Sequence, residues 1–427
     1  MASTADTSAA DTSTGMAYTS AVMAADTSAL FEATCLLVEA YITENINQYI
    51  QPTFHGTVLK EVAELLAITF QDCADDVSDM QIISEQALAV FYRHISPPRS
   101  NGNTFIRRKP NINKMQKKIE FLKAVPQPEQ RTPEWYAFRY QHLTASNIWK
   151  TFISDSTRNQ LIFEKCQPLN ADSFSRPPSL SSPMHWGQKY EPLSVMVYEA
   201  EYATGVSDFG CIPHNDIEFL AASPDGINTL ATSPRYGRML EIKNIVNREI
   251  NGNPKMEYWV QMQLQMEVCD LNECDFLETR FVEYADLEAF QNDEMPCKYK
   301  GLIVMFIKSS GHPVYEYAPL DLAVADSGPW QEAMMEKHKD LMWMKNIYWK
   351  LDQLSCVLVL RNKLWFAKAA LPQLKAIWAT IEEDKKSGYA HRGPKKSTAV
   401  RVRKMNANGS DDTNIEMTAK CFITIET

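Results

Sequence analysis

The amino-acid sequence predicts an α/β fold in which helices pack against a mixed central sheet, preceded by an N-terminal helical region. Two observations support this prediction. Between residues 184 and 308, helical patterns alternate with short β-forming runs in the order helix, three strands, helix, strands. Residues 30–94 instead repeat apolar side chains at the three- and four-residue spacing of amphipathic helices.

The N-terminal third divides into three segments. Residues 1–28 are mainly Ala, Ser, Thr and Asp, with AADTS occurring twice, so we expect a disordered tail that has little to bury. Residues 29–95 form the helical region, with helices expected over Leu30–Ile50, Thr57–Phe70 and Asp79–His94. Residues 96–124 open with SPPRSNG and are then rich in Lys and Arg. They indicate a basic linker, whose charge is explained first by a solvated linker and helix face and otherwise by a non-specific phosphate contact.

Residues 125–384 are expected to form the main domain. Thr132 resembles a helix N-cap, with Pro133 at the first helical position. A second helix covers residues 184–205, and Pro192 predicts either its start or a kink beside Glu191. The remaining elements are strands at Asp208–His214, Phe219–Ala222, Arg238–Val246, Cys274–Tyr284 and Gly301–Lys308, and helices at Pro254–Cys269, 327–349 and 370–384. Residues 385–427 form a basic tail that we expect to be disordered.

Composition excludes several classes of protein. No apolar run approaches the roughly 18 residues that cross a bilayer, and a basic region followed by an apolar core is lacking at the N-terminus, so we expect an intracellular protein without a membrane partner. The nine cysteines form no C-x-x-C pair, which argues against a zinc ribbon, a disulfide scaffold or an iron–sulfur cluster. The net charge of −10 does not exclude nucleic acid, because a local basic face can still bind phosphates.

The segment Ser223–Lys243 carries the strongest chemical signal. Ser223-Pro224-Asp225-Gly226 ends one strand, and Met239-Leu240-Glu241-Ile242-Lys243 forms the next. Alternation along a strand places Glu241 and Lys243 on one face, and the returning chain can bring Asp225 beside them. Taken alone, Asp225 fits an ordinary turn, and Glu241 with Lys243 fits a surface ion pair. Together, two carboxylates and an ammonium group can hold a divalent cation and a water, which is an arrangement that cleaves phosphodiesters.

These residues resemble the D…E-x-K signature of the PD-(D/E)XK nuclease superfamily. Four further motifs occur in the order expected of one of its branches: Trp135…Arg139…Thr144-Ala145-Ser146, Trp186-Gly187…Tyr190-Glu191, Ser223-Pro224-Asp225-Gly226, and Val260-Gln261-Met262-Gln263. Over residues 130–310 the chain is similar to the lambda exonuclease and YqaJ viral recombinase family, which includes viral alkaline nucleases and relatives from large DNA viruses. The resemblance implies a restriction-endonuclease-like core.

The resemblance also implies a role for each site residue. Asp225 and Glu241 would bind the catalytic Mg²⁺, with Mn²⁺ as an alternative, helped by the Ile242 carbonyl and by Glu191 as a third acid. Lys243 would position and polarise the attacking water. Gln261 would orient these groups from the following helix, where Gln263 and Gln265 are alternatives. Arg139 and Ser146 would hold the 5′-terminal phosphate of DNA, although a cap and a surface contact also explain them.

The implied activity is a metal-dependent deoxyribonuclease, a 5′→3′ exonuclease on double-stranded DNA that serves recombination or replication processing. The alternatives are an endonuclease, a nuclease that cleaves both DNA and RNA, and a non-catalytic DNA-binding protein. A single-strand annealing protein and further copies of the chain are the expected protein partners, and a viral chain would act in the host cytoplasm or nucleus. Residues 1–125 and the basic tail have no counterpart in the shorter phage enzymes.

Overall fold

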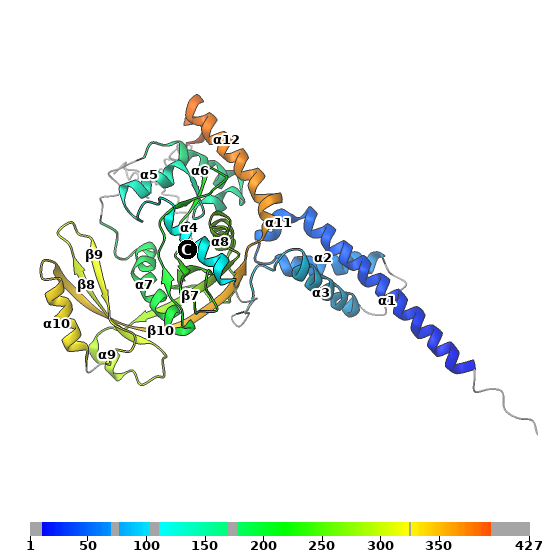
Figure 1. Cartoon of the computed structure of the whole chain (residues 1–427), viewed down its shortest axis with the longest axis horizontal. Coiled ribbons are helices and arrows are strands. Elements are labelled where there is room, and N and C mark those ends of the chain that lie inside the picture. The colour runs from blue at the N-terminus through cyan, green and yellow to red at the C-terminus, as the bar shows by residue number, and fades with distance from the viewer. Residues whose placement is uncertain (1–10, 70–76, 103–110, 170–176, 324–325, 394–427) are drawn as a thin grey trace, which may run out of the picture.

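The computed structural model describes residues 11–69, 77–102, 111–169, 177–323 and 326–393. A three-helix arm projects from one side of an α/β body, and a smaller lobe extends the body on the opposite side (Figure 1). The basic tail predicted at 385–427 falls outside the described residues from position 394 onward. Within the described residues, no helix is both long and apolar enough to cross a membrane.

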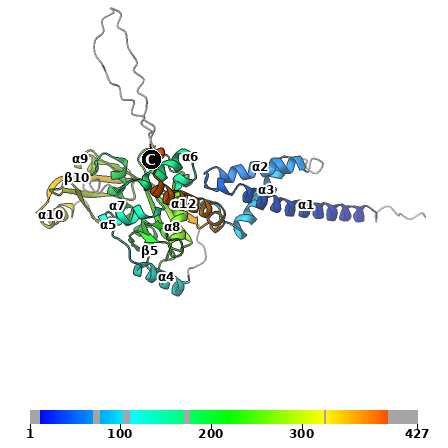
Figure 2. The same cartoon turned by 90° about the horizontal axis from the view of Figure 1, so that it is seen from above.

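The arm is formed by the N-terminal helices and is seen edge-on in Figure 2. Its elements are α1 (Asp11–Glu44), η1 (Ile46–Ile50), α2 (Phe54–Thr69) and α3 (Val77–His94). The prediction of disorder for residues 1–28 is wrong from residue 11 onward, because α1 begins there. The alanines of this segment favour a helix even though its composition offers little to bury. Residues 1–10 lie outside the described part of the chain.

The body is built on a seven-stranded sheet. Its strands, in spatial order, are β2 (Val206–Ser207), β5 (Gly226–Asn228), β6 (Met239–Asn244), β7 (Glu273–Glu283), β10 (Met342–Leu360), β8 (Lys300–Ile307) and β9 (Pro313–Tyr317). β6 and β7 are parallel and the other neighbours are antiparallel, so the mixed sheet predicted from the sequence is confirmed. A second, three-stranded sheet contains β1 (Leu143–Thr144), β4 (Leu220–Ala222) and β3 (Ile212–Pro213).

Helices cover both faces of the larger sheet, as expected for an α/β fold. They are α4 (Ile112–Ala124), α5 (Pro133–Gln141), α6 (Asp155–Cys166), α7 (Pro183–Tyr202), α8 (Met256–Val268), α9 (Leu287–Asn292), α10 (Ser327–Lys337), α11 (Lys363–Trp365) and α12 (Leu371–Ser387). Shorter helical turns lie at η2 (Ile148–Thr151), η5 (Phe366–Ala370) and η6 (Ala390–Arg392). On β6, Leu240 and Ile242 pack with Tyr198 of α7, whereas Met239 joins the core beneath α8.

The sequence prediction of a helix over 327–349 is wrong in its second half. The helix ends at Lys337, and β10 begins at Met342. Within the strand, Ile347 and Trp349 are buried while their neighbours are more exposed, which is the two-residue period of a strand. The Met- and Trp-rich composition of this region suits either structure, so it could not separate helix from strand.

β10 joins the body to the distal lobe, which we define as α9, β8, β9, α10 and the first half of β10. The first half of this 19-residue strand pairs with β8, and its second half pairs with β7 (Figure 1). The lobe has its own apolar cluster around Leu302, Val304 and Phe306. A separate, larger cluster runs continuously from the arm into the body. The described cysteines are all free.

Candidate active site

The candidate site lies where β5 leaves the edge of β6. The last pair between these strands joins Gly226 to Leu240, and Asp225 immediately precedes it. The Asp225 carboxylate accepts a hydrogen bond of 2.7 Å from the backbone N–H of Ile242. Because the N–H and C=O of one strand residue point the same way, the Ile242 carbonyl also faces this edge. The structure therefore brings Asp225 to the edge of the strand that carries Glu241 and Lys243.

Glu241 and Lys243 share the face of β6 that α8 covers. The Lys243 Nζ lies 2.5 Å from Glu241 Oε1. The other carboxylate oxygen of Glu241 accepts a hydrogen bond of 2.8 Å from Gln265 Nε2 on α8. Glu241 is fully buried, and the Lys243 side chain remains about a quarter exposed. The Lys243 side chain is therefore partly exposed to solvent, while the Glu241 carboxylate that its ammonium contacts is fixed in the protein interior.

Glu191 enters the site from α7. Its side chain is a third exposed and lies 3.7 Å from the guanidinium of Arg131. Arg131 lies in a turn and has a backbone φ of 68°. α7 begins at Pro183, so Pro192 lies inside the helix and cannot donate a hydrogen bond to the carbonyl of Gln188. Glu191 thus occupies a locally weakened part of the helix, and its charge acts on Asp225.

Charge in the site is unevenly balanced. Burial and the neighbouring carboxylates of Glu241 and Glu191 raise the pKa of Asp225 well above its usual value. Burial also raises the pKa of Glu191, against the opposing effect of Arg131. Burial alone would lower the pKa of Lys243, but the carboxylates of Glu241 and Asp225 outweigh it and raise that pKa. Lys243 is therefore a stable cation among carboxylates that repel one another.

The position of the glutamine differs from the leading expectation. Gln265 bonds Glu241, and it also donates to the carbonyl of Ser223 at 3.2 Å. Gln263 instead binds the end of β10, and Gln261 is half-buried without a side-chain hydrogen bond to the described residues. Gln261 and Gln265 are one helical turn apart, so the same face of α8 carries both. The contact expected of Gln261 belongs to Gln265.

The donors at this edge have the chemistry that Mg²⁺ prefers, namely carboxylate and carbonyl oxygens. The carboxylates of Asp225, Glu191 and Glu241 repel one another, and a divalent cation would relieve that repulsion. In the described part of the chain, however, no three His, Cys, Asp or Glu side chains already stand in a metal-holding arrangement. The residues fit the ion in type, while Lys243 and the Ile242 N–H occupy two of the carboxylate oxygens.

Arg139 and Ser146 meet at a second point, between the end of α5 and the turn after β1. Arg139 Nη2 donates a hydrogen bond of 2.6 Å to Ser146 Oγ, and its guanidinium lies 4.3 Å from the ring centroid of Trp135. Arg139 is half-buried, Ser146 is exposed, and the predicted cap Thr132 does begin α5. Among the described residues, no carboxylate forms an ion pair with Arg139. The structure therefore brings the two predicted phosphate-binding residues together.

Comparison with known proteins gives this region a family. Residues 134–272, which include both groups of residues, match the model of the YqaJ-like viral recombinase domain. This part of the chain is similar to a YqaJ-like viral recombinase domain, and we refer to residues 134–272 as the YqaJ-like domain. The family predicted from the motifs is thereby confirmed.

Proteins similar to this chain come from a virus and a bacterium. An uncharacterized protein of Acanthamoeba polyphaga mimivirus is 30% identical over 305 residues, which make up 61% of this chain. This chain spans only about half of that protein, 54% of its length. Two structures of the alkaline exonuclease LHK-Exo from Laribacter hongkongensis, one in complex with dAMP, are 20% identical. Each covers 60% of this chain and 95% of the exonuclease, with TM-scores of 0.36 and 0.35.

Two residues at the site, one inside the YqaJ-like domain and one just before it, were not expected. Tyr258, in the first turn of α8, places its ring centroid 4.8 Å from Lys243 Nζ and 5.6 Å from the Arg248 guanidinium. Arg131 pairs with Glu191. Neither residue belongs to a recognisable spacing, since α8 and the turn before α5 reach the site only through packing. The sequence therefore offered no signal for them.

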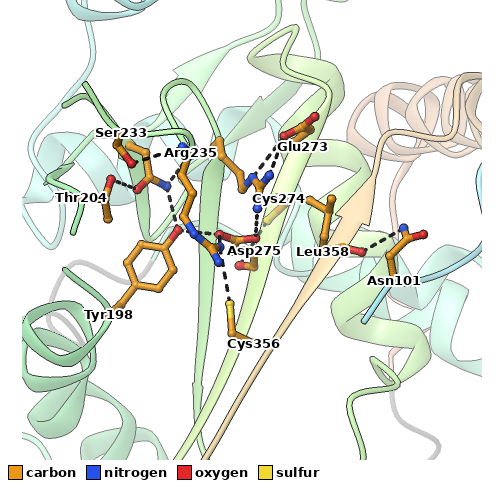
Figure 3. A network of polar contacts seen from close by, with 12 residues as sticks. Asn101, Tyr198, Thr204, Ser233, Arg235, Glu273, Cys274, Asp275, Cys356 and Leu358 are labelled. Carbon is orange, nitrogen blue, oxygen red and sulfur yellow. Dashed lines mark hydrogen bonds and ion pairs between the residues drawn. The ribbon is translucent and has the colours of Figure 1, made fainter. Parts of the chain in front are cut away.

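A buried polar network supports the β5–β6 hairpin of the YqaJ-like domain from behind (Figure 3). Asp275 of β7 accepts hydrogen bonds from Tyr198, Arg235 and Arg238, and Arg238 also pairs with Glu273. Arg235 and Arg238 lie in the connection between β5 and β6, whose far ends hold Asp225 and Lys243. The network thus fixes the turn of the hairpin whose open end forms the candidate site.

Proposed function

We propose that this chain is a metal-dependent deoxyribonuclease that digests double-stranded DNA as a 5′→3′ exonuclease, in recombination or replication processing. The observation that carries the proposal is the meeting of Asp225, Glu241 and Lys243 at one sheet edge, with Glu191 beside them, inside a YqaJ-like viral recombinase domain. An endonuclease and a non-catalytic DNA-binding protein are the alternative functions, and each would act differently on linear and circular DNA.

The proposed cofactor is Mg²⁺, with Mn²⁺ as an alternative. Asp225, Glu191, Glu241 and the Ile242 carbonyl are the groups that would hold it. When bound, such an ion activates water and stabilises charge on the phosphodiester. The lysine contributes independently of the ion, because an ammonium held in position stabilises the negative charge that develops on a scissile phosphate. Gln265 keeps Glu241 in place by donating a hydrogen bond to one of its carboxylate oxygens.

Arg139 and Ser146 are the proposed receptors for the 5′-terminal phosphate. A guanidinium bonds two oxygens of a phosphate at once, and the serine hydroxyl adds a third donor. Arg139 is stacked on Trp135 and lacks a carboxylate partner within the described residues, so no carboxylate there competes with an incoming anion. Recognition of a terminal phosphate would start digestion at a 5′ end and give it one direction.

Digestion of end-labelled linear duplex tests the proposal. The wild-type chain with Mg²⁺ should release nucleotides from the 5′ end, and a chelator should stop the reaction. Lys243→Ala and Asp225→Asn should each lower the rate by roughly 10²-fold or more, because they remove a charge that acts in the transition state. The amide introduced by Asp225→Asn would still accept the Ile242 hydrogen bond. Lys298→Ala, which breaks an exposed ion pair with Glu201, is the matched control and should be fully active.

Other substrates separate the parts of the proposal. Cleavage of closed circular duplex would contradict an exonuclease, and digestion of RNA duplex at a similar rate would contradict a deoxyribonuclease. Release of label from 3′ ends first would reverse the polarity. Full activity of Lys243→Ala or Asp225→Asn would remove the assignment of the site, whereas metal-independent binding of duplex with no cleavage would indicate a DNA-binding protein.

A further inference from the structure

Lys165 is a buried lysine that the proposed reaction does not use. It lies in the last turn of α6 and is only 6% exposed. Its Nζ donates hydrogen bonds of 2.6 Å to the backbone carbonyls of both Arg139 and His142, and lies 3.5 Å from that of Tyr140. The last carbonyls of a helix have no partner within the helix. Lys165 therefore caps the C-terminal end of α5 from a different element.

The two short hydrogen bonds span the segment that separates the proposed phosphate receptors. Arg139 is itself bonded through its carbonyl, and His142 lies four residues before Ser146. The guanidinium of Arg139 can reach Ser146 only if α5 stops and turns into β1 at this place. The amine needs two N–H groups for the two short bonds, and it has them whether or not it is protonated.

The positive charges of Lys165 and Arg139 also indicate a site for an anion. Burial, followed by the nearby charges of Arg139 and Lys385, lowers the pKa of Lys165 to about 7. Within the described residues, neither Lys165 nor Arg139 forms an ion pair with a carboxylate, and Glu164 beside Lys165 is instead paired with Lys150. A buried positive charge without a counter-ion is costly. A bound phosphate would supply the missing negative charge.

We infer that Lys165 is a positioning residue of the terminal-phosphate pocket, because it grips the carbonyls of Arg139 and His142 and so presents the Arg139 guanidinium beside Ser146. The inference rests on the proposed recognition of a 5′ phosphate. Lys165 acts on DNA only through Arg139, since its amine is directed to the backbone. Its loss should therefore weaken discrimination between DNA ends without removing the cleavage chemistry at Lys243.

Binding and cleavage of two matched duplexes test this role. The duplexes differ only in a 5′ phosphate or a 5′ hydroxyl, and binding is measured by fluorescence anisotropy with the metal chelated. The wild-type chain should favour the phosphorylated end, and Arg139→Ala should lose that preference. Lys165→Met should lower it by roughly 3- to 10-fold, as expected when a hydrogen-bonded support is lost. On duplexes with 5′-hydroxyl ends, the kcat of Lys165→Met should stay within about 2-fold of the wild-type value.

The controls keep the outcomes distinct. Lys150→Met removes a neighbouring lysine that binds Glu164 of α6 and does not touch α5, so it should leave the end preference unchanged. Lys165→Arg retains several N–H donors and should restore part of the preference, and thermal melting shows whether each variant folds. If Lys165→Met folds and keeps the full wild-type preference for the phosphorylated end, the inference about Lys165 is overturned and the proposed function is not. If the wild-type chain binds both ends equally, the phosphate pocket is wrong, and the role of Lys165 is lost with it. If Lys165→Met fails to fold, the test passes to Lys165→His, whose neutral ring carries one N–H donor. A wild-type preference in folded Lys165→His would overturn the inference.

Discussion

At the scale of single residues, Lys243 is held between a carboxylate and an aromatic ring. Glu241 fixes its ammonium at 2.5 Å, and the Tyr258 ring lies 4.8 Å from the same nitrogen. An ammonium over a ring face gains roughly 0.5–2 kcal/mol, depending on how far it is desolvated. The ring therefore restricts the positions open to a long and otherwise flexible side chain.

Tyr258→Leu should lower the single-turnover cleavage rate by roughly 2- to 30-fold, because about 0.5–2 kcal/mol of ring contact is lost. Tyr258→Phe keeps the ring and should retain most of the activity. Equal losses in the two variants would show that the hydroxyl, or something other than the ring face, is what matters. No loss in Tyr258→Leu would contradict the role of the ring.

Lys165 gives the protein a stability that changes with pH. Its folded pKa is about 7, below the ordinary lysine value of 10.5. Between these values the unfolded chain binds more protons at this residue than the folded chain, so the free energy of unfolding rises with pH. The unfolding free energy of the wild type minus that of Lys165→Met should therefore increase from pH 7 to pH 10. Urea midpoints across that range measure it, and parallel curves would contradict the lowered pKa.

Asp225, Glu241 and Lys243 could be predicted from the sequence because one strand and one turn bring them together. Gln265 could not be distinguished from Gln261, since the two share a helix face and only the docking of α8 on the sheet decides which one meets Glu241. Arg131 and Tyr258 depend on the same long-range packing. Local geometry was thus predictable, whereas contacts between elements were not.

At the scale of elements, the β5–β6 hairpin depends on charges buried at its closed end. Asp275 is almost fully buried and forms ion pairs with both Arg235 and Arg238, with Tyr198 donating a further hydrogen bond of 2.6 Å (Figure 3). Removing one partner of a buried ion pair leaves a charge without compensation, which is far more costly than breaking an exposed pair. We therefore expect Asp275 to be important for the stability of the hairpin turn.

Asp275→Asn should destabilise the protein by about 3–5 kcal/mol, because the buried Arg235 loses its carboxylate partner and Arg238 keeps only Glu273. Glu336→Gln, which breaks an exposed pair with Lys339, should change stability by less than about 1 kcal/mol. Urea unfolding of the two variants measures the contrast. A loss below about 1 kcal/mol in Asp275→Asn would show that the network is not what secures the hairpin.

Elements with one dominant period were predicted from the sequence. α5, α8 and β6 appear within a few residues of their expected positions. β10 was missed because half of its length lies in the distal lobe, where the strand is exposed on both faces and shows no alternation until Ile347. The pairing of each half with a different neighbour is a property of the sheet, not of the segment.

At the scale of the whole molecule, the arm is joined to the body through a buried arginine. Arg99 donates hydrogen bonds to the carbonyls of Ile50 in the arm and Pro254 before α8, at 3.0 and 2.9 Å. Its own carbonyl accepts a hydrogen bond from Trp259 Nε1 at 3.1 Å, and that indole stacks with Tyr49. One apolar core then continues from arm to body. The arm is thus attached next to the helix that carries Tyr258 and Gln265.

Arg99→Met should destabilise the protein by about 2–4 kcal/mol, because two buried carbonyls lose their donor. It should also make the chain between the arm and α4 more sensitive to limited proteolysis, which would release a fragment containing residues 1–95. Urea unfolding and mass analysis of the digest measure the two effects. An unchanged cleavage pattern would mean that the apolar core alone holds the arm.

The length of β10 has a consequence for synthesis of the chain. β7 has its parallel neighbour β6 as soon as residue 283 leaves the ribosome, but its other edge stays open until β10 is made, more than 60 residues later. At a synthesis rate of roughly 5–20 residues per second, that edge stays unpaired for several seconds. The strand carrying Glu278 and Asp275 is therefore open to pairing with other chains until β10 covers its edge.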